Sequence, residues 1–200
     1  NEMKIEKIEL IQFSQPLKRP FVTSFGRQEE REGLLVALYA EGLIGWGECV
    51  AGSDPGYSYE TVETAWHIAT QFLIPKLLGQ SFEEPEDVVV LMQKVRGHPM
   101  AKAMFDQAAW DLTAQRDGVS FAERLAAPYA EGAKARVKVG VSIGIQDSIG
   151  ATKQVIANHL EEGYGRIKLK IRPGHDLAFA RTIRAAFPEP LIMLDANSAY

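Results

Sequence analysis

Two lysines separated by one residue, Lys168 and Lys170, are the side chains in this sequence whose types and spacing suggest chemistry. They lie in the run Arg166-Ile-Lys-Leu-Lys-Ile171, and in a β-strand both would project from one face while the apolar side chains project from the other. Burial and a neighbouring ammonium group both disfavour the charged form of a lysine. Such a lysine can take a proton from carbon. The alternative is a surface strand with two solvated lysines.

The sequence around the pair favours the first interpretation. Strands are expected over residues 137–145, 166–171 and 191–195, with helices over 146–162 and 175–186 between them. A β-α-β-α-β pattern with short connections is typical of a parallel sheet with crossover helices. We therefore expect the start of an α/β (TIM-type) barrel, consisting of its first three β/α units.

Polar residues end each of the three expected strands. Ser142 lies near the end of the first strand, Lys170 ends the second, and Asp195 and Asn197 follow the third. Function in an α/β barrel gathers at the carboxyl ends of the strands, and a carboxylate there is a suitable oxygen ligand for Mg²⁺. Taken alone, Asp195 is equally suited to capping a following helix. Together with the paired lysines it predicts one site at the barrel mouth.

Residues 1–130 are expected to form a separate α+β domain, with residues 131–200 as the incomplete barrel domain. An antiparallel meander comes first, and residues 16–28 between its first two strands resemble an extended arm with a loop. Helices follow the meander. The expected strands are residues 4–13, 33–40 and 43–50, and the expected helices are residues 60–78, 85–96, 99–116 and 121–125.

Composition excludes several classes of function. The net charge is −4 without a basic block, which argues against a nucleic-acid partner. No apolar run approaches the roughly 20 residues that span a bilayer, and the N-terminus does not resemble a signal peptide. Cys49 is the only cysteine, so no internal disulfide can form and a cytoplasmic location is expected.

Several motifs together carry a family resemblance. Ile167-Lys-Leu-Lys-Ile171 followed by Leu194-Asp-Ala-Asn197 resembles the enolase superfamily, in its muconate-lactonising subgroup. Other motifs are similar to the family of o-succinylbenzoate synthases and N-acylamino acid racemases, and the resemblance covers nearly the whole chain. These motifs are Pro20-Phe-Val-Thr-Ser-Phe-Gly26, Gly45-Trp-Gly-Glu48, Pro55-Gly-Tyr57, Trp110-Asp-Leu112, Gly140-Val-Ser-Ile-Gly-Ile145 and Asp195-Ala-Asn-Ser-Ala-Tyr200.

The resemblance implies a capping domain, a barrel, and removal of a proton next to the carboxylate of a small-molecule substrate. Lys170 would be the acid/base and Lys168 its electrostatic partner. Asp195 would be the first of three ligands for Mg²⁺, or Mn²⁺ in its place, and the metal would stabilise the enediolate. The reaction would be dehydration of a cyclohexadiene carboxylate in menaquinone biosynthesis or racemisation of an N-acylamino acid, including N-succinylamino acids. Nothing in these residues separates the two.

The resemblance also implies seven substrate-binding residues. Two lie in the barrel, and five lie on an arm and a loop that close over the pocket and exclude water. The two in the barrel are Ser142 and Asn197, and Ser142 would face a succinyl group. The other five are Phe21, Ser24 and Phe25 in the arm, and Ser53 and Tyr57 in the loop.

The family's chemistry also needs two carboxylates ending the fourth and fifth barrel strands and a second lysine ending the sixth. None of these lies in the 200 residues, and three parallel strands leave an unpaired edge. We therefore expect the chain to be part of a longer, homo-oligomeric protein and to be inactive alone. A function of another class, as an inactive fragment or a non-catalytic assembly module, stays open.

Overall fold

The computed structural model describes all of residues 1–200, and their contacts divide them into two units. The N-terminal unit comprises residues 1–15 and 31–134, and the C-terminal unit comprises residues 16–30 and 135–200. Residues 16–30, which contain most of the expected arm, therefore group with the later part of the chain. A single boundary near residue 130 does not describe this grouping, because residues 16–30 precede that boundary.

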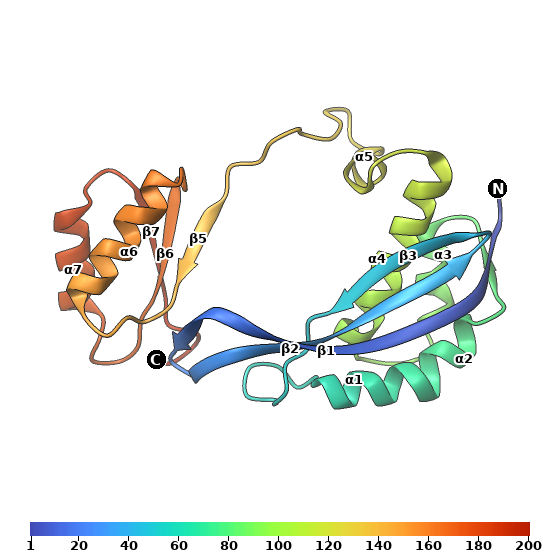
Figure 1. Cartoon of the computed structure of the whole chain (residues 1–200), viewed down its shortest axis with the longest axis horizontal. Coiled ribbons are helices and arrows are strands. Elements are labelled where there is room, and N and C mark those ends of the chain that lie inside the picture. The colour runs from blue at the N-terminus through green and yellow to red at the C-terminus, as the bar shows by residue number, and fades with distance from the viewer. The chain divides into compact units, whose positions relative to one another are not determined.

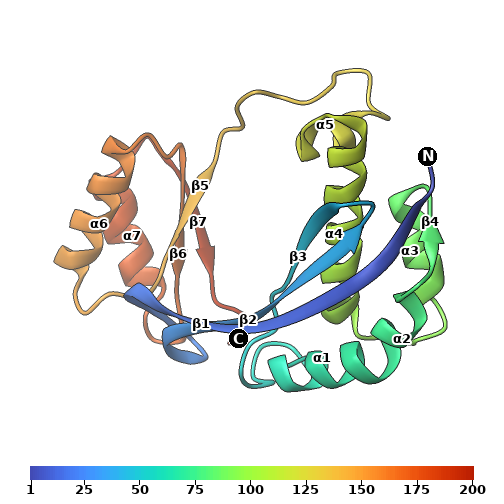
Figure 2. The same cartoon turned by 45° about the vertical axis from the view of Figure 1, so that its right-hand side comes forward.

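The N-terminal unit combines a β-sheet with helices (Figure 2). Its four strands lie in the order β3-β2-β1-β4. The strands are β1 (Met3–Thr23), β2 (Gly26–Ala40), β3 (Leu43–Cys49) and β4 (Ser81–Phe82). The helices are α1 (Val62–Ile68), the π-helical segment η1 (Ala69–Leu73), α2 (Ile74–Leu77), α3 (Pro85–Met92), α4 (Pro99–Asp117) and α5 (Phe121–Ala126).

The helix expected over residues 60–78 is interrupted at η1. Pro75 has no N–H to donate to a carbonyl one turn earlier, so a regular α-helical ladder cannot pass through it. The chain forms a wider π turn just before Pro75. None of the helices has the length and apolar character needed to cross a membrane.

Two glycines allow α4 to pack directly on β3 (Figure 2). Gly45 and Gly47 share one face of the strand, and Trp46 projects from the other with 47% of its surface exposed. A Cβ atom at Gly47 would lie 1.8 Å from the Met104 carbonyl oxygen, and one at Gly45 would lie 2.2 Å from that of Ala108. The glycines are therefore required by the close approach of the two backbones.

Gly47→Ala should lower the free energy of unfolding by about 2–3 kcal/mol, because the new methyl group meets rigid helix backbone. Urea unfolding followed by tryptophan fluorescence measures this, since all three tryptophans lie in the N-terminal unit. Gly52→Ala is the control in the same unit, because its Cβ would meet only the Asp54 carbonyl oxygen, at an ordinary contact distance of 3.9 Å. Equal stability of the two variants would contradict the packing argument.

The C-terminal unit contains the expected parallel sheet, in the order β5-β6-β7. Helices α6 and α7 lie together on one side of it (Figure 1). The fold prediction, an α+β capping domain followed by three β/α units, is confirmed. The elements are β5 (Gly140–Ile143), α6 (Ile149–Glu161), β6 (Arg166–Lys170), α7 (Leu177–Ala186) and β7 (Leu191–Asp195).

Alternation along β6 separates an apolar face from a charged face. Ile167 and Leu169 are buried in a hydrophobic cluster with residues of α6 and α7. Lys168 and Lys170 project from the opposite face. In the register of the sheet, Lys168 lies between Ser142 of β5 and Met193 of β7, and Lys170 lies beside Asp195.

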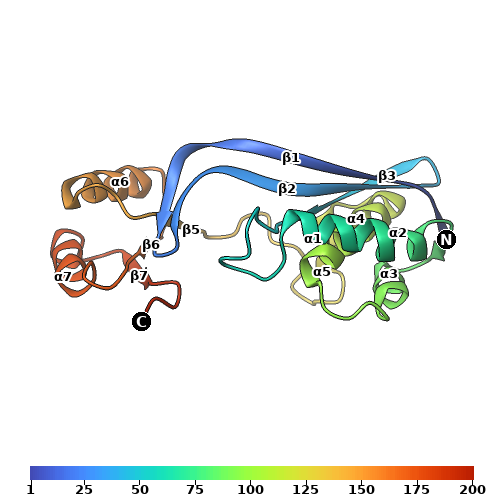
Figure 3. The same ribbon diagram turned by 90° about the horizontal axis from the view of Figure 1, so that it is seen from below.

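The expected arm is a β-hairpin. β1 and β2 continue through residues 16–30 and turn at Ser24-Phe25. The tip lies beside the ends of the parallel strands (Figure 3), where the Ile145 N–H donates to the Val22 carbonyl oxygen at 2.8 Å. A Cβ at Gly144 would lie 3.0 Å from the Val22 backbone, so the small residue after β5 admits the arm.

Candidate active site

The paired lysines converge on one carboxylate. Lys170 is 7% exposed, and its Nζ atom donates to Asp195 Oδ2 at 2.7 Å and to Asn197 Oδ1 at 2.7 Å. Lys168 is more open, at 35% exposed, and its Nζ atom lies 3.2 Å from the same Asp195 oxygen. Lys170 is therefore a buried side chain with two hydrogen-bond partners and not a solvated surface lysine.

Asp195 is held in its ionised form. The hydrogen bond from Lys170, the Asn197 N–H bond to Oδ1 at 2.9 Å, and Lys168 together lower the pKa of Asp195 to about 2, although burial acts in the opposite direction. An ionised carboxylate at neutral pH is what a metal ligand requires. The same charge is also what holds the two ammonium groups in place.

The turn after β7 gives Asn197 its position. Asn197 and Ser198 have φ angles of 49° and 60°, in the left-handed region that asparagine tolerates better than most residues. This conformation lets one residue make two contacts, because its N–H reaches Asp195 and its side-chain oxygen reaches Lys170. Asp195 is thus engaged by this turn and by the lysines.

Four other predicted residues lie in the same unit. Ser142 is exposed and lies beside Lys168 in the sheet register. A Cβ at Gly144 would lie 3.2 Å from the Phe21 ring, so this ring packs at the end of β5. Phe25 is 57% exposed at the hairpin turn. The Ser24 hydroxyl donates to the Ala196 carbonyl oxygen at 2.8 Å, and its contribution to substrate binding stays a prediction.

Ser53 and Tyr57 belong to the N-terminal unit. They lie in a loop whose base is closed by a hydrogen bond from the Val62 N–H to the Gly52 carbonyl oxygen at 2.8 Å. Tyr57 is 79% exposed. Their contribution to substrate binding stays a prediction.

The family follows from comparison with known proteins. Residues 7–125 match the family model described as mandelate racemase / muconate lactonizing enzyme, N-terminal domain. The chain belongs to this family. It is therefore a member of the enolase superfamily, in the muconate-lactonising subgroup, as its motifs predicted.

Individual members of the family resemble the chain over almost its whole length. It is 43% identical over 199 residues to an o-succinylbenzoate synthase of Geobacillus kaustophilus, and 44% identical over 198 residues to an N-succinylamino acid racemase of Thermus thermophilus. Each match covers 99% of this chain and 52% of the relative. The chain thus spans about half the length of these curated relatives.

A solved structure shows the same relation. It is a protein from Enterococcus faecalis V583 described as an unknown member of the enolase superfamily, which is 41% identical with a TM-score of 0.85. The match covers all of this chain and 53% of that one.

The metal that the family resemblance implies fits this chain only in part. Asp195 supplies one ionised, hard oxygen ligand of the kind that Mg²⁺ selects. The 200 residues contain no group of three or more histidine, cysteine, aspartate or glutamate side chains placed to hold a metal ion. The described residues therefore provide one ligand of a metal site and not a whole one.

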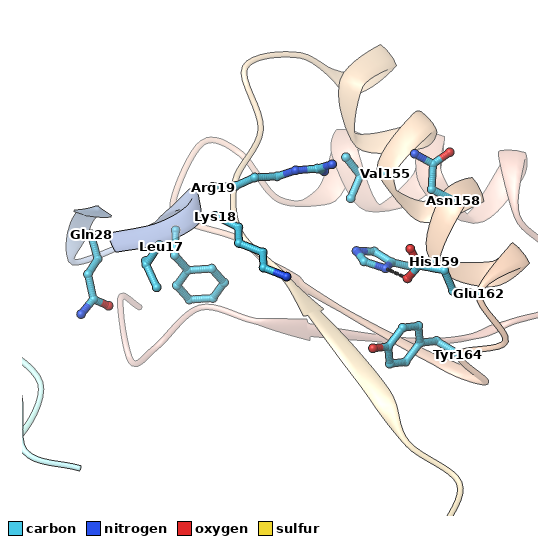
Figure 4. Close-up of a pocket in the computed structure, with 10 residues that line it drawn as sticks. Leu17, Lys18, Arg19, Gln28, Val155, Asn158, His159, Glu162 and Tyr164 are labelled. Carbon is cyan, nitrogen blue, oxygen red and sulfur yellow. Dashed lines mark hydrogen bonds and ion pairs between the residues drawn. The ribbon is translucent and has the colours of Figure 1, made fainter. Parts of the chain in front are cut away.

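A separate hollow of about 690 Å³ lies between the arm and α6 (Figure 4). His159 Nδ1 lies 2.8 Å from the Glu162 carboxylate there, and the Tyr164 ring meets the His159 ring edge-on at 5.4 Å. Sequence reasoning assigned no role to His159, although its spacing of three residues from Glu162 on a helix predicts such a pair. Neither predicted catalytic lysine lines this hollow.

Proposed function

We propose that the chain carries the proton-abstracting part of an o-succinylbenzoate synthase, which dehydrates a cyclohexadiene carboxylate on the route to menaquinone. The observation that carries the proposal is the cluster at the ends of β6 and β7. It holds the buried Lys170 within 2.7 Å of both Asp195 and Asn197, with Lys168 beside it. The similarity to a named o-succinylbenzoate synthase supports the same assignment.

Lys170 is the base in this proposal. Its Nζ atom takes the proton from the carbon next to the substrate carboxylate, and the electron pair left behind expels the β-hydroxyl group. Proton and hydroxyl leave overall as water, and the ring becomes aromatic. Asn197 and Asp195 fix the Nζ atom by two hydrogen bonds, so little reorganisation is needed when the substrate arrives.

Lys168 and Ser142 bind the substrate in this proposal. The Lys168 ammonium is about one-third exposed and can meet the substrate carboxylate, whose charge increases as the proton leaves. Ser142 lies next to it on β5, exposed at the same face, where its hydroxyl can bond the succinyl group.

Asp195 would hold Mg²⁺, or Mn²⁺ in its place, together with ligands from beyond the described residues. When bound, the metal would act as a Lewis acid on the substrate carboxylate. Removing divalent metal from the full-length protein with EDTA should lower the synthase rate by about 100-fold or more, and added Mg²⁺ should restore it. EDTA already saturated with Mg²⁺ is the control, and full activity in metal-free protein would contradict the metal assignment.

N-acylamino acid racemisation is the second candidate, and the 44% identity to an N-succinylamino acid racemase favours it. Racemisation would use Lys170 on one face of the substrate and needs a second acid/base on the other. Lys168 and Lys170 both project from β6, so neither supplies that opposite face. The second group would have to come from another part of the full-length protein.

The deciding experiment assays both reactions on the full-length protein. We expect turnover of the cyclohexadiene carboxylate, followed by the absorbance of the aromatic product. Racemisation of an N-succinylamino acid, followed by optical rotation, tests the second candidate. A protein that is active on the amino acid alone would replace the first proposal by the second. A protein inactive in both assays would overturn both proposals.

A further inference from the structure

One side-chain hydrogen bond connects the tip of the arm to the turn that carries the site. The Ser24 hydroxyl donates to the Ala196 carbonyl oxygen at 2.8 Å, across 172 positions of sequence. Ser24 is partly buried, and both residues belong to the C-terminal unit. A second bond, from the Ile145 N–H to the Val22 carbonyl oxygen, attaches the same tip to the end of β5.

The peptide that Ser24 holds lies between the two site residues of the turn. The chain passes from Asp195 through Ala196 to Asn197, and Asn197 and Ser198 are both left-handed. The Ala196 carbonyl also accepts the Ala199 N–H at 3.2 Å, which closes the turn on itself. Rotation of this peptide would move the Asn197 side chain, whose oxygen lies 2.7 Å from Lys170 Nζ.

We propose that Ser24 is a positioning residue for Lys170. Its hydroxyl holds the Ala196 carbonyl and keeps the turn in the conformation that directs Asn197 toward the base. The inference rests on the proposed function, because it assumes that Lys170 abstracts the substrate proton. It differs from the sequence-based expectation that Ser24 binds substrate, since the hydroxyl proton is donated to the protein backbone.

This arrangement couples the docking of the arm to the positioning of Lys170. While the arm is docked, the turn is held and the base is in place. When the arm lifts, the Ala196 carbonyl loses the hydrogen bond from Ser24. The turn then loses this contact with the arm. The arm therefore does more than exclude water, because its docking also completes the geometry of the acid/base. Lids that complete a catalytic arrangement on closing are a known device in enzymes.

The test compares Ser24→Ala with Ser24→Thr in the full-length protein. Ser24→Ala should lower kcat about 10- to 100-fold while KM changes less than about threefold, because the base is misplaced and substrate contacts remain. Ser24→Thr keeps a hydroxyl and should recover most of the lost kcat. A KM that rises with kcat unchanged would overturn the inference and return Ser24 to substrate binding.

Ser148→Ala is the matched control. The Ser148 hydroxyl also bonds to backbone, because it accepts the Ala151 N–H at 3.0 Å at the start of α6. Its loss should reduce stability but leave kcat and KM within about twofold of wild type. If Ser148→Ala lost as much kcat as Ser24→Ala, general destabilisation would explain both losses. That result would overturn the inference.

Hydrogen–deuterium exchange separates failure of this inference from failure of the proposed function. Ser24→Ala should speed exchange both in the arm tip, residues 21–27, and in the turn, residues 195–199, in the absence of substrate. Unchanged exchange in the turn would overturn the connection through Ser24, whatever the activity. A wild-type protein inactive in both assays would overturn the proposed function instead.

Discussion

Lys170→Ala should lower kcat by about a thousandfold or more in whichever of the two reactions the full-length protein performs, because it removes the acid/base itself. Bulk water is poorly placed to act as the base instead, because Lys170 is only 7% exposed. KM should change far less, because the proposed contact between Lys168 and the substrate carboxylate is kept. Steady-state assays with both substrates measure the effect.

Two further variants sharpen the result. Lys138→Ala removes an exposed lysine of the same unit and should leave kcat within about twofold of wild type. Lys170→Arg keeps the charge but not the ability to lose a proton, so it should be nearly as inactive as the alanine variant. Substantial activity in either Lys170 variant would show that another group is the base.

Asp195→Asn should lower the free energy of unfolding of the C-terminal unit by about 2 kcal/mol near neutral pH, because it leaves Lys168 and Lys170 without their shared counter-charge. The magnitude follows from the lowered pKa of Asp195, about 2 against an ordinary value of 3.8. The value of about 2 kcal/mol is an upper figure, because the Asp195 side chain is 26% exposed and solvent screens its charge. The same variant should lose activity if Asp195 is a metal ligand.

The stability difference should depend on pH with a definite sign. Asp195 has a folded-state pKa below its unfolded value, so its contribution is complete above about pH 4 and is lost as the pH falls through about 2. Wild type and Asp195→Asn should therefore converge on acidification. Urea unfolding followed by circular dichroism is suitable, because the tryptophans lie in the other unit.

Asp147→Asn is the control for this series, since Asp147 is an exposed carboxylate in the loop before α6. Its difference from wild type should stay within about 0.5 kcal/mol and show no trend over the same pH range. A constant gap between wild type and Asp195→Asn from neutral to acidic pH would contradict the electrostatic explanation.

The sequence was informative where structure depends on short-range periodicity. Alternation in β6 placed both lysines on one face, and β7 ends at Asp195 as expected. The β-α-β-α-β order required the strand ends to meet at one edge, which brought Lys170 and Asp195 into register. Each of these properties is set by neighbours a few residues away, so the local pattern was sufficient.

Other features depended on contacts between distant parts of the chain. The sequence placed residues 16–28 in an arm, but it did not show that the arm docks on the end of β5 or that Ser24 bonds to Ala196. Burial of Lys170 likewise depends on Asp195 and Asn197, which follow it by 25 and 27 positions.

The sequence by itself therefore determined which residues share a face and which strand ends meet at one edge. Only the tertiary structure decided which polar groups bond there. Ser24 is the clearest case, because its hydroxyl is equally suited to a substrate or to a backbone carbonyl. The partner that it finds is set by where the arm docks, 172 positions away in sequence, and no local pattern encodes that placement.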